Sequence, residues 1–193
     1  MSTQQDPQHA NAQPLDAEQL YQVMLAGMRQ VLANATQAVR LVGVASGGVW
    51  LAQRLHKDLG LVGEIGVISS SMHRDDFAQR GLSATAAQTR LPFEVNDAHI
   101  WLVDDVLYTG RTLRAVLNEL FDFGRPHSVK LAVLLERPGY KQLPVCADFV
   151  AGVANVPPSQ SLELALNADQ GLRFDVQDVS SSKDQPEHHT KTK

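Results

Sequence analysis

The stretch WLVDDVLYTGRT, Trp101–Thr112, sets two adjacent acids directly behind an apolar run and follows them with a small, hydroxyl-rich turn. Residues 98–105 (AHIWLVDD) predict a buried β-strand, and residues 110–124 (GRTLRAVLNELFDFG) predict an amphipathic helix. A strand that passes through a short loop into a helix is the building unit of parallel sheets. Ligands of such sheets gather outside the carboxyl ends of the strands, where Asp104 and Asp105 stand.

The rest of the chain repeats this alternation of strands and helices. A helix is expected from about Asp16, with an apolar set of Leu20, Val23, Met24 and Val31 packed on the core. The other expected elements are a helix at 47–60 and strands at 38–45, 63–71, 128–136, 147–153 and 161–166. We therefore predict an α/β fold with a mostly parallel, twisted sheet flanked by helices.

A length of 193 residues suits one compact domain, which we place at residues 15–166. Residues 1–14 are rich in Gln, Asn, Ser and Pro and are expected to be a disordered leader. Residues 167–193 form a C-terminal extension that frays from about residue 180. Residues 72–94 lose all periodicity, which favours a lid, a binding loop or a protruding hairpin.

Composition excludes several classes of protein. The formal net charge of −4 argues against a protein that holds nucleic acid by bulk charge. Cys146 is the only cysteine, so no intramolecular disulfide forms; we expect a buried, inert thiol and a cytoplasmic protein. Neither a secretion signal nor a membrane span is expected, because no run of about 20 apolar residues occurs.

The loop after the two acids has the chemistry of a phosphate site. Thr109–Thr112 lie where the loop turns into the helix, so backbone N–H groups and the helix dipole can hold a phosphate. Gly110 permits close approach of the backbone, and the threonines add hydroxyl donors. The carboxylates of Asp104 and Asp105 can accept hydrogen bonds from ribose hydroxyls, and Mg²⁺ can use hard oxygens of the same ligand. The stretch is typical of a phosphoribosyl site.

The stretch has three other interpretations. The acids could simply cap a turn. The apolar run ending in acids also fits an ATPase Walker B strand, but the nearest phosphate loop, GVASGGVW from Gly43, has Val49 where lysine is required. A G-x-G-x-x-G dinucleotide motif is likewise absent after the first strand, so an oxidoreductase loses its main support.

VDDVLYTGRT closely resembles the signature of type I phosphoribosyltransferases, and more narrowly that of the PyrR family of pyrimidine operon regulators that are also uracil phosphoribosyltransferases. The resemblance runs from about Leu15 to Leu166 and includes LVGVASGGVWLAQRL, HRDDF, FGRPHSVKLAVLLER, LPVCADFV and NVPPSQS. It implies a type I phosphoribosyltransferase fold with a hood over the site, at about 72–94. It also implies conversion of uracil and 5-phosphoribosyl-1-pyrophosphate (PRPP), with Mg²⁺, to UMP and pyrophosphate.

The resemblance also assigns residues. Asp104 and Asp105 would bind the ribose hydroxyls, and Arg74 on the hood would meet pyrophosphate. The phosphate-binding residues would be Val106, Leu107, Tyr108, Thr109, Gly110, Arg111 and Thr112, and the base would rest on Val156, Pro157, Pro158 and Ser159. Arg137 is either a second cation near the site or a surface arginine. No direct protein ligand of the metal is assigned.

Two departures from the family pattern stand out. The pyrophosphate loop, commonly Thr-Arg-Gly, is here Ala45, Ser46, Gly47 and Gly48, which keeps hydroxyl and amide donors but loses the arginine charge. Charge-assisted contacts are about twice as strong as neutral ones, so we expect weaker pyrophosphate binding unless Arg74 or Arg90 compensates.

The second departure concerns RNA. Members of the family that attenuate transcription bind leader mRNA on a basic face. Here Arg29 is the only basic residue of the first predicted helix, and Lys141 is the only one of the PGYKQ segment. The enzyme hypothesis therefore comes first. A nucleotide-sensing RNA-binding regulator with little or no catalysis, and a phosphoribosyltransferase for another base, stay open. The family also implies a homodimer or higher homo-oligomer.

Overall fold

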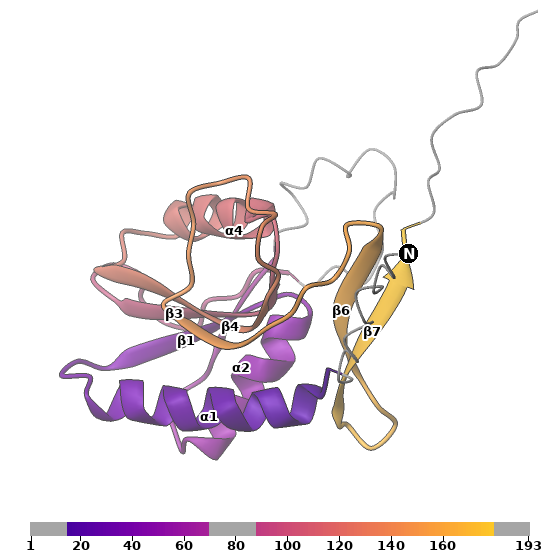
Figure 1. The fold of residues 1–193 in the computed structure, drawn as a ribbon. Coiled ribbons are helices and arrows are strands. Elements are labelled where there is room, and N and C mark those ends of the chain that lie inside the picture. The colour runs from indigo at the N-terminus through magenta and orange to yellow at the C-terminus, as the bar shows by residue number, and fades with distance from the viewer. Residues whose placement is uncertain (1–14, 70–87, 180–193) are drawn as a thin grey trace, which may run out of the picture.

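The computed structural model describes residues 15–69 and 88–179 (Figure 1). The leader predicted at 1–14, the frayed tail from 180 and the larger part of the predicted hood, including Arg74, lie outside the described residues.

A five-stranded parallel sheet forms the centre of the molecule, as predicted (Figure 1). Its strands lie in the order β2-β1-β3-β4-β5, and every neighbouring pair is parallel. The strands are β1 (Val39–Val44), β2 (Gly66–Ile68), β3 (His99–Leu107), β4 (Ser128–Glu136) and β5 (Phe149–Val153). Strand β3, which carries the two acids, is thus the middle strand and is buried through most of its length.

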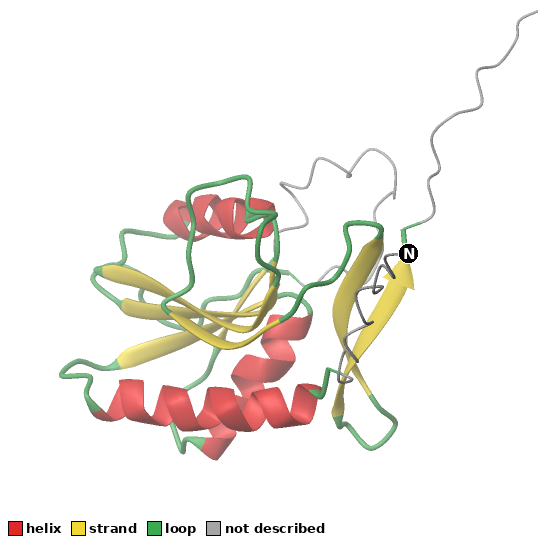
Figure 2. Cartoon of the chain, viewed as in Figure 1, coloured by secondary structure: helices red, strands yellow, loops and turns green. Residues whose placement is uncertain are grey.

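Helices cover both faces of the sheet (Figure 2). Helices α1 (Ala17–Ala33) and α2 (Gly47–Asp58) share one apolar core with the sheet, while α4 (Arg111–Asp122) packs on the other face. This arrangement makes a topological switch, because the connection after β1 leaves toward one face and the connection after β3 leaves toward the other. Such a switch opens a crevice at the carboxyl ends of the two strands.

Helix α1 begins where the sequence predicted, because the side chain of Asp16 accepts a hydrogen bond from the N–H of Gln19 at 3.0 Å. Its fully buried stripe is Tyr21, Met24 and Met28, spaced three and four residues apart. The expectation that Val23 packs on the core was wrong. Val23 lies off this stripe and is 46% exposed.

A second, two-stranded sheet stands beside the first (Figure 1). Strands β6 (Gln160–Leu166) and β7 (Leu172–Asp178) form an antiparallel hairpin, in which Leu162 pairs with Val176 and Leu164 with Phe174. Strand β7 was not predicted from the sequence. The predicted domain boundary at residue 166 falls between these paired strands.

Charged side chains link α1 to helix α2 and to the β6–β7 hairpin. Glu18 accepts hydrogen bonds from Arg54 of α2 at 2.7 Å and from the N–H of Leu172 in β7 at 2.8 Å. The hydrogen bond from Arg54 is the main reason that the pKa of Glu18 is lowered. The Arg54 guanidinium also stacks over the ring of Tyr21 at 4.1 Å. The hairpin is therefore tied to α1 through a side chain as well as through apolar packing.

The single cysteine does not lie where composition predicted. Cys146 is exposed, so the prediction of a buried thiol was wrong. It lies in the irregular segment between β4 and β5, which runs over the surface rather than through the core. Within residues 15–69 and 88–179, no helix is long and apolar enough to cross a membrane.

Candidate active site

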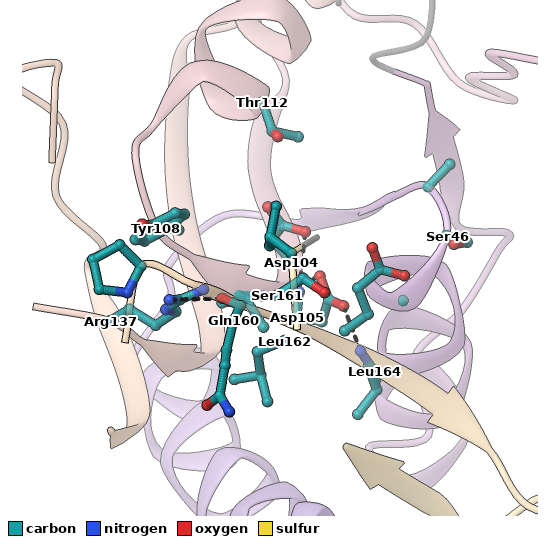
Figure 3. Close-up of a pocket in the computed structure, with 16 residues that line it drawn as sticks. Ser46, Asp104, Asp105, Tyr108, Thr112, Arg137, Gln160, Ser161, Leu162 and Leu164 are labelled. Carbon is teal, nitrogen blue, oxygen red and sulfur yellow. Dashed lines mark hydrogen bonds between the residues drawn. The ribbon is translucent and has the colours of Figure 1, made fainter. Parts of the chain in front are cut away.

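A cavity of about 340 Å³ lies at the carboxyl ends of β1 and β3 (Figure 3). It brings together segments that are far apart in the sequence. The lining residues are Ala45, Ser46, Gly47, Asp104, Asp105, Val106, Tyr108, Thr112, Arg137, Pro158, Gln160, Ser161, Leu162, Glu163, Leu164 and Val179. All three predicted segments, the loop at 45–48, the stretch at 104–112 and the proline segment at 156–159, thus contribute to one cavity.

The loop after β1 enters α2 directly against the end of β3. A Cβ atom built on Gly48 would lie 2.2 Å from the carbonyl oxygen of Val103, and one built on Gly47 would lie 2.4 Å from Oδ2 of Asp105. Both distances are too short for any side chain, so these glycines allow the helix start to meet the strand. The N–H of Val49 donates to the carbonyl oxygen of Ser46 at 3.0 Å. The N–H groups of Gly47 and Gly48, the first two of α2, have no acceptor within the helix by their position, so they suit an anion.

The two acids have different surroundings. Asp104 is buried, with 8% exposure, and its Oδ1 accepts a hydrogen bond from the N–H of Asp105 at 3.0 Å. Asp105 accepts from the N–H of Val106 at 3.0 Å through Oδ1 and from the N–H of Leu164 at 3.1 Å through Oδ2. Both carboxylates border the cavity, but the second one also joins β3 to the hairpin.

The turn after β3 requires a glycine at position 110. Gly110 begins α4 with a φ of 86°, and a Cβ there would meet Val145 at 2.6 Å, so glycine is needed for both reasons. Thr112, in the first turn of α4, lines the cavity with Tyr108. The exposed side chain of Arg111 turns to Gln142, to which its Nε donates at 2.9 Å.

Not all seven residues predicted to bind phosphate reach the cavity. Val106, Tyr108 and Thr112 line it, whereas Thr109, Gly110 and Arg111 are absent from its wall. Leu107 is buried in the core on the α4 side of the sheet. The turn also carries the first backbone N–H groups of α4, which have no acceptor within the helix, although the N–H of Arg111 lies 3.4 Å from Oγ1 of Thr109.

Arg137 is a buried residue rather than a surface arginine, with 2% exposure. Its Nη2 donates to the carbonyl oxygens of Val156 and Pro157, both at 2.9 Å, and of Gln160 at 3.1 Å. Its guanidinium lies over the ring of Tyr108, 3.9 Å from the centroid. Arg137 therefore holds the proline segment against the loop that follows β3 (Figure 3).

The predicted base segment is only partly exposed to the cavity. Pro158 lines it, while Val156 is buried and Pro157 and Ser159 do not line it. The next five residues, Gln160–Leu164, all form cavity wall but were not among the predicted site residues. A signal was present, because only one residue separates the strand predicted at 161–166 from the proline segment.

Cations are scarce around the cavity. Within the described residues, Arg137 is the only arginine or lysine of the lining, and its Nη2 is engaged by backbone carbonyls. The structure does not bring Arg90 to the cavity, because this exposed side chain pairs with Glu64 at 2.6 Å. The other arginine predicted to compensate for the missing loop arginine, Arg74, lies outside the described residues.

Comparison with known proteins identifies this arrangement. Residues 15–159 match the phosphoribosyl transferase domain family. The chain is 48% identical over 154 residues to "Bifunctional protein PyrR" of Ralstonia nicotianae, covering 79% of this chain and 87% of that relative. It is 42% identical over 166 residues to the protein of the same name from Nitrosococcus oceani, covering 84% and 92%.

Solved structures agree on the fold. A hypoxanthine-guanine phosphoribosyltransferase from Bacillus anthracis superposes with a TM-score of 0.59 at 19% identity, over 74% of this chain and 84% of that chain. The Leishmania tarentolae enzyme in complex with GMP gives a TM-score of 0.55 at 21% identity, over 74% and 81%. At such identities the likeness concerns the fold alone, and it confirms the predicted α/β architecture.

Proposed function

The chain belongs to the phosphoribosyl transferase family, among the relatives named bifunctional PyrR proteins, and we propose that it converts uracil and PRPP to UMP and pyrophosphate. The observation that carries this proposal is the convergence of the loop at 45–48, the stretch at 104–112 and the proline segment in one cavity. In this proposal the first segment binds the pyrophosphate of PRPP, the second binds its ribose phosphate, and the third contacts the base.

The ribose phosphate fits the end of β3. In this proposal Asp104 accepts from ribose hydroxyls, with Asp105 beside it, and the first turn of α4 holds the 5′-phosphate through backbone N–H groups and the hydroxyl of Thr112. Acceptors and donors thus stand at opposite ends of one short loop, which matches the polarity of the ligand. Because the ribose hydroxyls and the phosphate bind at different ends of the loop, the sugar is also held in one orientation toward the base segment.

Mg²⁺ suits this donor set as a partner of PRPP. Within the described residues no group of three or more His, Cys, Asp or Glu side chains gathers to hold a metal by itself. Mg²⁺ is commonly bound through one or two carboxylates together with phosphate and water oxygens. Asp104 and Asp105 are the carboxylates that would hold it here with PRPP, where it would supply charge neutralisation of the phosphates.

The chain's own contribution to the reaction is positioning and electrostatic stabilisation. Breaking the bond between C1′ and the pyrophosphate oxygen builds positive charge on the ribose, which the neighbouring carboxylates stabilise. The same step releases pyrophosphate, a polyanion. Ser46 and the first N–H groups of α2 face that leaving group as neutral donors. The base rests against the segment held by Arg137, so the attacking nitrogen is brought into line with C1′.

The decisive test is a nucleotide-forming assay with PRPP, Mg²⁺ and a panel of uracil, cytosine, hypoxanthine, guanine and xanthine. We expect UMP and pyrophosphate with uracil, and near-complete loss in the protein carrying both Asp104→Asn and Asp105→Asn. Asp122→Asn, at the exposed end of α4, is the matched control and should retain activity. Turnover of a purine instead of uracil would identify a transferase for another base, and PRPP binding without any turnover would refute the enzymatic proposal.

A second function is favoured by the word "bifunctional" in the names of the relatives. We propose regulation of pyrimidine operon expression through uridine-nucleotide-dependent binding of leader mRNA by a homo-oligomer. The test is a fluorescence titration of leader RNA at physiological salt, with and without UMP. Affinity that depends neither on RNA sequence nor on UMP would refute it, whereas UMP-sensitive, sequence-specific binding would support it.

A further inference from the structure

The carboxylate of Asp105 is bound to backbone N–H groups on both of its oxygens. One oxygen accepts from Val106, its own neighbour in β3, and the other accepts from Leu164 in β6, which is 59 residues away in the sequence. Figure 3 shows the contact between Asp105 and Leu164 across the floor of the cavity. A side chain that only bound substrate would not need the second of these contacts.

The contact with Leu164 provides a hydrogen-bond acceptor for a backbone N–H on the unpaired edge of the hairpin. Strand β6 pairs with β7 alone, so every second N–H of β6 points away from its partner strand. The N–H of Leu164 is one of these, and Asp105 provides its acceptor. Leu164 itself is 5% exposed and packs in the core shared with α1 and α2. Asp105 therefore replaces a neighbouring strand at this point.

Gly47 provides the space for this contact. A Cβ on Gly47 would lie 2.4 Å from Oδ2 of Asp105, the same oxygen that receives the hydrogen bond from Leu164. Any side chain at position 47 in this backbone conformation would displace that oxygen.

The position of β6 determines the shape of the cavity. Gln160–Leu164 form a continuous part of its wall, and they belong to the same strand that Asp105 holds. Arg137 fixes the beginning of this strand through the carbonyl of Gln160 at 3.1 Å. Arg137 and Asp105 thus hold the first and the last residue of this part of the wall.

We infer that Asp105 is a positioning residue, which holds β6 as a wall of the site through Leu164 in a space provided by Gly47. The kinetic part of this inference rests on the proposed uracil phosphoribosyltransferase function, while the structural part does not. Asp104 and Asp105 then differ in role although they are adjacent and chemically identical. Contact of Asp105 with a ribose hydroxyl is compatible with this role, because a carboxylate oxygen accepts more than one hydrogen bond.

The test compares amide hydrogen exchange in the ligand-free full-length protein and in its Asp105→Asn, Asp104→Asn and Gly47→Ala variants. Asparagine has one acceptor oxygen and presents an NH₂ group where the second acceptor stood. We expect the amide of Leu164 to exchange about tenfold faster or more in Asp105→Asn and in Gly47→Ala. It should be unchanged in Asp104→Asn, and amides of β1 serve as an internal reference for global stability.

Kinetics with uracil supply the second measurement. Asp105→Asn should raise the KM for uracil more than it lowers kcat, because a displaced wall weakens base binding, and Gly47→Ala should follow it. Asp104→Asn should instead lower kcat. Unchanged protection of Leu164 in both Asp105→Asn and Gly47→Ala would overturn the inference. If no variant and no wild-type protein forms nucleotide, the proposed function fails while hydrogen exchange still decides the role of Asp105.

Discussion

Replacement of Arg137 by methionine tests the most heavily buried charge of the site. The guanidinium is 2% exposed, and its Nη2 donates to the carbonyls of Val156, Pro157 and Gln160. Methionine fills a similar volume but donates no hydrogen bond. The three backbone carbonyls therefore lose their donor, and no substitution can remove a backbone carbonyl in the same way as a side chain. This differs from replacing a buried ion pair, where both charges can be removed together.

The expected cost is about 3 kcal/mol of unfolding free energy. Hydrogen bonds from charged donors contribute about 1.5–3 kcal/mol each, but here one nitrogen serves three acceptors and two of the contacts are only partly buried. For a protein of this size, each kcal/mol shifts the melting temperature by about 2–4 °C, which gives a fall of about 6–12 °C. Uracil should also bind more weakly, since the base segment loses its support.

Urea unfolding followed by circular dichroism measures this effect, with an unchanged slope confirming a change in stability rather than in compactness. Arg114→Met is the matched control, because Arg114 is an exposed arginine on α4, and its free energy should change by no more than about 0.5 kcal/mol. Arg137→Lys should fall between wild type and Arg137→Met. An Arg137→Met protein as stable as the control would refute the assignment of Arg137 as the support of the base segment.

Three further outcomes are expected. Gly48→Ala should destabilise by about 2 kcal/mol or more, because its Cβ would lie 2.2 Å from the backbone oxygen of Val103; a melting temperature equal to that of wild type would contradict this. The lowered pKa of Glu18, caused mainly by Arg54, stabilises the fold above the ordinary carboxyl pKa of 4.5, and this contribution is lost as pH falls through the lower folded value. Because the pair is partly exposed, Glu18→Gln should cost only about 1 kcal/mol at pH 7 and less at pH 3, as acid titrations of both proteins would show. Cys146 should react stoichiometrically with a thiol reagent in the native protein, and protection until denaturation would show that it is covered.

Local patterns in the sequence predicted the central sheet well. The strands and helices around the two acids follow from continuous apolar runs and from helical periodicity, which are properties of neighbouring residues. The cavity at the end of β3 follows from the same reasoning, because strand ends in a parallel sheet meet at one edge. Asp104 was therefore placed at the end of this strand, and Gly110 at the turn into α4, before any tertiary contact was known.

Contacts between distant segments were beyond such reasoning. Strand β7 alternates weakly, and its pairing with β6 depends on burial of Leu162 and Leu164 that only the tertiary structure supplies. The burial of Arg137 was equally hidden, since its partners are backbone carbonyls about 20 residues away, and carbonyls carry no signature in a sequence. Cys146 was placed wrongly because cysteine is usually buried, whereas this one lies on a surface segment.

The bond between Glu18 and the N–H of Leu172 joins residues 154 positions apart. On the ribosome, where chains are made from the amino end, α1 and the parallel strands can begin to associate while the hairpin does not yet exist. A nascent chain that ends at residue 159, where the family match stops, would have its acids and phosphate loop but no wall opposite them. The described cavity is therefore complete only after β6 has been synthesised, which comes late in the production of the chain.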